Sequence, residues 1–285
     1  MQTPTRLTDR TALARFRARA RRDPNSALFL HDRAASELHE RLAEVKRSFS
    51  APAIVTGFPE AWAGVLPGAT VVPDAETLDL QPGRHDLVVH ALALHWADDP
   101  VGQLVQCRRA LQADGLFMAM LFGGQTLAEL RAALAEAESR LTGGLSPRVL
   151  PMGEIRDLGA LLQRAGFALP VADSAPLTVR YESAFHLMRD LRAMGETNAL
   201  AQRHRAPARR ALFTEAARIY AAHHAGADGR VPATFETVWL TGWAPHESQQ
   251  KPQRPGSATA RLADALGTEE YDPTATPPRL DRDGS

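Results

Sequence analysis

Short apolar runs recur along the first half of the chain and predict buried strands. They are APAIVTG at 51–57, ATVVPD at 69–74 and HDLVVHALAL at 85–94. A fourth run, LFMAMLFGG at 116–124, is almost wholly apolar and ends in a glycine pair. A run this apolar is typical of a central parallel strand that helices cover on both faces.

Amphipathic segments follow these runs and predict helices. In DPVGQLVQCRRALQADG, Asp99 is a predicted N-cap, Pro100 takes the first helical position and Gly115 is the predicted stop. Further helices are predicted near 126–141 and 154–165. The strand, helix, strand order around Pro100 predicts a right-handed crossover unit.

The second half continues the alternation and fixes the expected architecture. PLTVRY and TFETVWLTGWA alternate like strands, and a helical insertion at 183–223 separates them. The chain therefore predicts an α/β fold, an open sheet with helices on both faces. Ligands of such sheets bind beyond the carboxyl ends of the strands. His95 and Trp96, which follow the strand at 85–94, are predicted to lie there.

Composition excludes several classes of protein. The 33 basic and 33 acidic residues balance, which removes the positive field expected of a general nucleic-acid binder. Cys107 is the single cysteine, so no intrachain disulfide forms, and no secretory signal pattern is present. No apolar window reaches the ~18 to 20 residues of a membrane-spanning helix. We expect a cytoplasmic protein.

The two ends of the chain differ from the middle. Residues 1–48 are expected to be a helical, arginine-rich segment, in which RTALARFRARARR contains no acidic residue. This stretch is either a solvated helix whose Leu13 and Phe16 touch the domain or a helix that docks on an anionic surface such as the inner face of a membrane. The domain is expected to span 49–250, and 251–285 is expected to be disordered because it is rich in Pro, Gly and polar residues.

Longer motifs carry a resemblance to a known family. HDLVVHALALHWADDPVGQLVQCRRALQADGLFMAMLFGGQTLAEL, with DLGALLQRAGF after it, resembles the second half of class I S-adenosylmethionine-dependent methyltransferases. ALFLHDRAASELHERL, DLRAMGETNAL, DGRVPATFETVWLTGWAPHESQ and RPGSA are similar to the branch of BioC-like and complex I assembly-factor proteins. The resemblance implies a Rossmann-like sandwich with S-adenosylmethionine as cofactor. It also implies methyl transfer, or an action on a respiratory complex I subunit that includes arginine hydroxylation in part of the family.

The chain departs from this family after the first strand. The family has a glycine-rich loop there, whose backbone approaches the cofactor closely. In IVTGFPEAWAG, Gly57 remains but Phe58, Pro59 and Glu60 follow it. Ile54 and Leu87 are only 33 positions apart, so one strand and one helix are expected to be missing and the sheet to have about six strands. VVPDAETLDL is then either the strand whose acidic end holds the cofactor ribose or the next one.

The resemblance and the strand ends together give the candidate cofactor residues. They are Gly57, Phe58, Asp74, Ala75, Glu76, Ala91, Leu92, His95 and Trp96. Asp74 and Glu76 would accept hydrogen bonds from the cofactor, or are ordinary turn residues. Trp96 stacks beside adenine or packs against the following helix. His95 and Asp99 are the candidate general bases.

Two distant segments are predicted to form a partner-recognition surface. Gly195, Glu196 and Asn198 in MGETNAL are expected to approach His246 and Glu247 in GWAPHESQ at the substrate mouth. In the simpler alternative, Gly195 stops a helix and His246 caps a strand end.

The sequence does not support a metal site or nucleophilic hydrolysis, and two alternative functions remain open. His85 and His95 would face away from His90 on a strand, so no metal site is predicted. No Gly-x-Ser-x-Gly motif exists, and Cys107 lies inside a predicted helix. The competing function is a non-catalytic assembly chaperone that has lost the cofactor. A third possibility is an adaptor that binds surfaces through its arginine-rich N-terminus.

Overall fold

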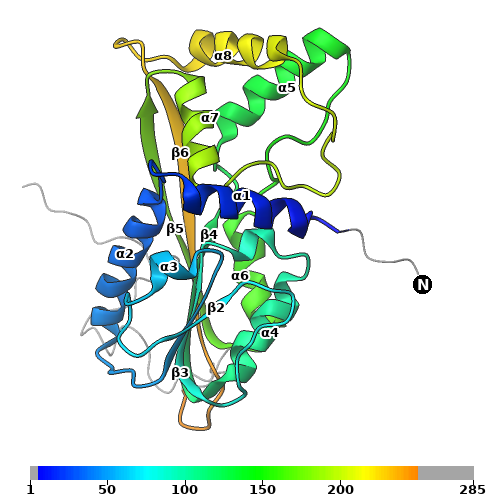
Figure 1. Cartoon of the computed structure of the whole chain (residues 1–285). Coiled ribbons are helices and arrows are strands. Elements are labelled where there is room, and N and C mark those ends of the chain that lie inside the picture. Colours follow the sequence, from blue (N-terminus) through cyan, green and yellow to red (C-terminus); the bar gives the residue numbers. More distant parts are fainter. Residues whose placement is uncertain (1–5, 250–285) are drawn as a thin grey trace, which may run out of the picture. The chain divides into compact units, whose positions relative to one another are not determined.

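A mixed sheet of six strands lies at the centre of the protein, in the order β2-β1-β3-β4-β6-β5 (Figure 1). The computed structural model describes residues 6–249, of which those up to His246 belong to one compact unit. The strands are β1 Pro52–Thr56, β2 Thr70–Pro73, β3 His85–Ala91, β4 Leu111–Phe122, β5 Ala168–Tyr181 and β6 Val231–Trp243. The first four are parallel, and β6 runs antiparallel to both of its neighbours. The predicted α/β class and the predicted six strands are confirmed.

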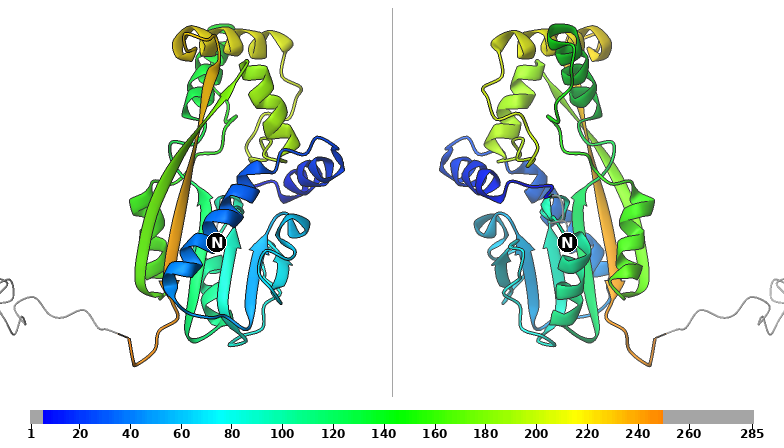
Figure 2. Two further views of the ribbon diagram at one scale, coloured as in Figure 1. Left: turned by 90° about the vertical axis from the view of Figure 1, so that its left-hand side faces the viewer. Right: turned by 90° about the vertical axis from the view of Figure 1, so that its right-hand side faces the viewer.

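Helices cover both faces of the sheet, as the doubly apolar strands require. In chain order they are α1 Arg10–Arg22, α2 Phe29–Val45, α3 Pro59–Trp62, α4 Pro100–Ala110, α5 Ala128–Thr142, α6 Ile155–Arg164, α7 Ala184–Ala193 and α8 Arg210–His224. In β4, Met118 and Met120 pack with α2, α5, α7 and α8, whereas Phe117 and Leu121 pack with α4 and α6. Helix α1 belongs to neither layer and lies beyond the ends of the parallel strands (Figure 2).

The front of the sheet is shortened, as the spacing predicts. Between β1 and β2 the only helix is α3, which has four residues. Strand β2 pairs directly with β1, with Val55 opposite Val72, and forms the edge of the sheet. Asp74 therefore follows the strand adjacent to β1. Its role toward the cofactor ribose stays a prediction.

Two local predictions meet different outcomes. The helical insertion appears as α7 and α8 between β5 and β6. The predicted stop at Gly115 is wrong, because α4 already ends at Ala110. Leu111 has an extended backbone and pairs with His85, so the sheet takes over before the glycine is reached. The predicted disordered tail at 251–285 lies outside the described residues. None of the helices between residues 6 and 249 has the length and apolar content that crossing a bilayer requires.

Helix α2 supplies a test of the core. Leu38 is fully buried in the cluster that joins α2 to β1, β3 and β4. We expect Leu38→Ala to lower the free energy of unfolding by ~2 to 5 kcal/mol, because the truncated side chain leaves a cavity. Urea unfolding followed by circular dichroism measures this loss. Leu141→Ala, at a leucine that is 49% exposed, is the control and should change stability by less than ~0.5 kcal/mol. Equal losses in both variants would contradict the packing described here.

Candidate functional site

The carboxyl ends of β1 and β2 border an open depression of about 620 Å³. This is the edge at which an open α/β sheet binds its ligands. Gly57 follows β1, and Asp74 follows β2. The opposite wall comes from Arg10, Arg17 and Arg21 of α1. The predicted location of the site is thus a hollow, but the chain's own arginines line it.

These arginines take up the hydrogen-bond acceptors of the edge. Arg17 is 5% exposed, and its Nη1 donates to Asp74 Oδ1 over 2.7 Å. Arg10 Nη1 lies 3.3 Å from Asp74 Oδ2, and Arg10 also donates to the main-chain oxygen of Asp74. Arg21 Nη2 donates to Gly57 O over 2.7 Å. Leu13 and Phe16 pack against the domain, as the first of the two sequence interpretations expects. Neither interpretation anticipated that arginines of this helix bind the edge of the sheet.

The loop after β1 does not form a cradle. A Cβ at Gly57 would lie 2.3 Å from Arg17 Cζ, so only glycine leaves room for the guanidinium. Phe58 is 2% exposed, and its ring packs edge-on against His31 with centroids 5.1 Å apart. Phe58, a candidate cofactor residue, thus lies in the core.

The loop after β2 is fastened to α4 through main-chain oxygens. Gln103 Nε2 donates to Ala75 O over 2.5 Å, and Gln106 Nε2 donates to Glu76 O over 3.0 Å. Gln103 Oε1 lies 3.0 Å from His90 Nε2, so one amide links β3 to this loop. Sequence reasoning missed both glutamines, although their spacing places them on one face of the predicted helix.

Trp96 and Glu196 form a polar contact beside the strand ends. Trp96 is 3% exposed and donates from Nε1 to Glu196 Oε2 over 2.8 Å. His95 Nε2 lies 3.6 Å from the same oxygen. Burial alone would raise the pKa of Glu196, but His95, the charge of Arg17 and the Trp96 hydrogen bond together lower it. Glu196 is therefore ionised at neutral pH. The sequence placed these residues in separate candidate sets, and the structure joins them.

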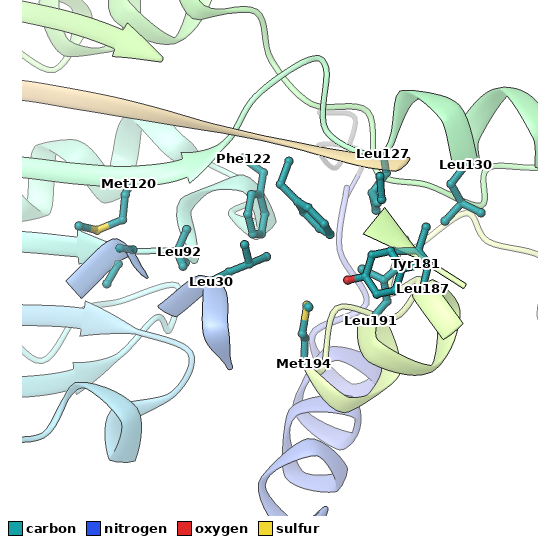
Figure 3. Packing of buried hydrophobic residues seen from close by; sticks show 14 of the residues in the cluster. Leu30, Leu92, Met120, Phe122, Leu127, Leu130, Tyr181, Leu187, Leu191 and Met194 are labelled. Carbon is teal, nitrogen blue, oxygen red and sulfur yellow. The ribbon is translucent and has the colours of Figure 1, made fainter. Parts of the chain in front are cut away.

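The remaining candidates near β3 have structural surroundings. Asp99 accepts from Gly102 N over 2.8 Å and caps α4, as predicted. Ala91 and Leu92 are buried in the core cluster. Figure 3 shows Leu92 there. His95 packs its ring against Phe122 with centroids 4.9 Å apart. Neither ring nitrogen of His95 has a hydrogen-bond partner among the described residues.

The structure does not bring Gly195, Glu196 and Asn198 to His246. Gly195 follows α7 with φ of 78°, and Asn198 Nδ2 donates to Pro147 O over 2.9 Å. His246 lies three residues beyond the end of β6, whose Trp243 pairs with Leu116 in the first half of β4. Because β6 is antiparallel to β4, its carboxyl end lies at the opposite edge from Glu196. Glu247 begins a second unit of the chain. The partner-binding role of these residues stays a prediction.

An apolar cavity of about 290 Å³ adjoins the Trp96–Glu196 contact. Its wall is formed by Leu30, Phe122, Leu127, Leu130, Leu191 and Met194. Figure 3 shows these side chains gathered from α2, the end of β4, the start of α5 and the end of α7. Glu196, Asn198 and Arg148 add polar groups to this lining. Glu138 offsets the charge of Arg148, because Arg148 Nη2 and Glu138 Oε1 are 2.6 Å apart.

The fold and the chain's similarity to known sequences define its class. Residues 37–119 match the family described as "Methyltransferase domain". They run from α2 through β1, β2 and β3 into β4, which is the half of the sheet that carries the depression. The chain belongs to the class I S-adenosylmethionine-dependent methyltransferase superfamily. S-adenosylmethionine is the cofactor of that superfamily.

Within the superfamily, the chain is similar to two groups of curated proteins. It is 39% identical over 199 residues to arginine-hydroxylase NDUFAF5, mitochondrial, of Danio rerio, covering 70% of this chain and 62% of that protein. It is 38% identical over 178 residues to malonyl-[acyl-carrier protein] O-methyltransferase of Laribacter hongkongensis, covering 62% of this chain and 57% of that protein. The chain thus spans less than two thirds of the length of either relative.

A solved structure of low identity can also be compared. A SAM-dependent methyltransferase from Thermotoga maritima has a TM-score of 0.41 and 12% identity, covering 82% of this chain and 99% of that one. The resemblance that the sequence motifs indicate, to the BioC-like and complex I assembly-factor branch, is confirmed by the curated relatives.

The carboxyl edge, as arranged here, does not accommodate S-adenosylmethionine. The Arg17 guanidinium lies against buried Gly57, and both carboxylate oxygens of Asp74 are paired with arginines. A ribose hydroxyl cannot donate to Asp74 at full strength while two cations hold its oxygens. The chain's own residues take the positions that the resemblance assigns to the cofactor.

His31, beside this loop, provides a pH test. It is 7% exposed, and its Nδ1 accepts from Trp62 Nε1 over 2.9 Å. Burial lowers the pKa of His31 from 6.5 to about 4. Between these values the unfolded chain binds a proton that the folded chain does not, so stability falls as the pH drops, by ~3 kcal/mol in all.

We expect His31→Gln, which keeps an acceptor for Trp62, to lose this part of the acid sensitivity. Urea unfolding at about pH 7 and about pH 4.5 measures it as the difference between the variant and the parent. His223→Gln, at an exposed histidine of α8, is the control and should keep the parental pH dependence. The same acid sensitivity in His31→Gln and in the parent protein would disprove the assignment.

Proposed function

We propose that this protein is a methyltransferase-like factor that acts on an arginine of a respiratory complex I subunit, with S-adenosylmethionine as its cofactor. Its similarity to arginine-hydroxylase NDUFAF5 and to malonyl-[acyl-carrier protein] O-methyltransferase supports the proposal. The two reactions that it includes are methyl transfer and arginine hydroxylation.

The observation that carries the substrate class is the ionised Glu196 at the wall of the apolar cavity. An arginine side chain combines an apolar stem with a planar cation that pairs with carboxylates. The apolar wall suits the stem, and Glu196 suits the guanidinium. Glu138 already offsets Arg148, which reduces the repulsion that an incoming cation would meet.

A second candidate function is a non-catalytic assembly chaperone. The position of Arg17 on Gly57 and Asp74 favours the chaperone. A protein that does not use the cofactor does not need an open cofactor groove. In both candidates the protein acts on the cytoplasmic side, with at most peripheral contact with the inner face of the membrane. Arg15 and Arg22 remain exposed on α1 for such contact.

Gene deletion and complementation in the source organism test the proposal. Loss of the gene is expected to reduce assembled complex I on native gels, and the parent gene should restore it. Glu196→Gln keeps an acceptor for Trp96 but removes the charge, so an arginine substrate should bind about tenfold or more weakly and assembly should recover poorly. Glu40→Gln, at an exposed glutamate of α2, should complement fully.

Intact masses of the complex I subunits separate the candidates. A subunit that lacks one methylene in the deletion strain indicates methyl transfer, and one that lacks one oxygen atom indicates hydroxylation. Unchanged masses together with lost assembly indicate the chaperone. Normal assembly and unchanged masses in the deletion strain would refute the proposed function.

A further inference from the structure

Helix α1 is anchored at its start to the segment that follows α7 and near its end to the carboxyl edge of the sheet. At its start, Asp9 N donates to Ala199 O over 2.7 Å, and Asp9 Oδ2 accepts from Arg203 Nη2 over 2.9 Å. Near its end, Arg21 Nη2 donates to Gly57 O over 2.7 Å. Arg17 lies between these anchors, with its side chain directed at the edge of the sheet.

The Arg17 guanidinium lies against Gly57, the glycine at which the family resemblance implies that the cofactor would bind. The ideal Cβ of Gly57 would lie 2.3, 2.5 and 2.7 Å from Arg17 Cζ, Nη1 and Nε. The guanidinium therefore rests directly on the Gly57 backbone, the surface that a glycine loop keeps free for a ligand. The same guanidinium holds Asp74, the carboxylate at the end of β2.

The contact is incomplete on the arginine side. Nη1 has a partner in Asp74, but Nε and Nη2 of Arg17 are buried without one among the described residues. A buried donor without a partner destabilises the docked position, because it has lost its hydrogen bonds to water. The remaining support comes from packing, with Arg17 Cζ 5.9 Å from the centre of the Phe58 ring. The two unpartnered donors weaken the binding of Arg17 at this edge. A weakly held side chain is suited to reversible binding.

We propose that α1 is an autoinhibitory plug: the Arg17 guanidinium and S-adenosylmethionine compete for Gly57 and Asp74, and α1 releases Arg17 when the cofactor binds. The proposal rests on the proposed function, because it assumes the superfamily's cofactor. It gives a role to Gly57 after β1 and to Asp74 after β2. Both residues serve the closed state as well as the open one.

Release of α1 also reaches the apolar cavity. Thr8 forms a β-bridge with Leu200, and Ala201 N donates to Leu7 O over 2.8 Å. The segment that follows α7 carries Glu196 and Asn198, which line the cavity. Movement of α1 therefore loosens one wall of the cavity at the moment at which the cofactor groove opens, and the two hollows are coupled.

Calorimetric titration of the full chain with S-adenosylhomocysteine tests the plug. Arg17→Ala is expected to bind this probe at least tenfold more tightly than the parent protein, because the competitor is gone. Arg15→Ala, at an exposed arginine of the same helix, is the matched control and should bind like the parent. An affinity of Arg17→Ala that equals or falls below that of the parent, including no binding by either, overturns the plug.

A second measurement on the parent protein keeps the test independent of the variant's folding. Hydrogen exchange of residues 10–22 should accelerate when saturating S-adenosylhomocysteine is added. Unchanged or slower exchange in this helix contradicts the plug.

The outcomes also separate this proposal from the proposed function. If neither protein binds the probe while gene deletion still impairs complex I, the plug is wrong and the chaperone stands. If Arg17→Ala gains affinity while deletion has no effect on complex I, the plug stands and the proposed function fails.

Discussion

A buried ion pair between Arg17 and Asp74 holds the N-terminal helix on the working edge of the sheet. The two side chains are 6% and 7% exposed, and their closest atoms are 2.7 Å apart. Moving both charges out of water is costly, so the pair persists because each ion offsets the other. Through this contact α1 forms one wall of the depression beside Gly57, and through Asp9 it holds the segment that carries Glu196. Helix α1 thus contacts both the depression and the segment that lines the apolar cavity.

The shortened front of the sheet explains why a helix from outside the layers takes this position. With α3 reduced to four residues and β2 at the edge, little else covers the carboxyl ends of β1 and β2. A helix with six arginines and no acidic residue suits an edge that ends in the Asp74 carboxylate. The chain therefore combines a reduced form of the superfamily's core with an internal occupant of its ligand edge.

The architecture was predictable wherever a local pattern determines it. Apolar positions on both faces identified β3 and β4, Asp99 identified the start of α4, and the spacing from Ile54 to Leu87 gave the number of strands. The site was less predictable because its contacts join distant positions. Arg17 and Asp74 are 57 residues apart in the sequence. The pattern of polar and apolar positions in a basic helix normally predicts that its arginines face solvent. The edge at which His246 emerges depends on the antiparallel direction of β6, which no local pattern in that strand reveals.

In the plug proposed above, Arg17 and the cofactor cannot share this edge. A crystal structure of the full chain with S-adenosylhomocysteine tests it most directly. We expect the ribose hydroxyls to donate to Asp74 and the Arg17 guanidinium to have left both Asp74 and Gly57. S-adenosylhomocysteine bound at this edge with the Arg17–Asp74 contact intact would contradict it.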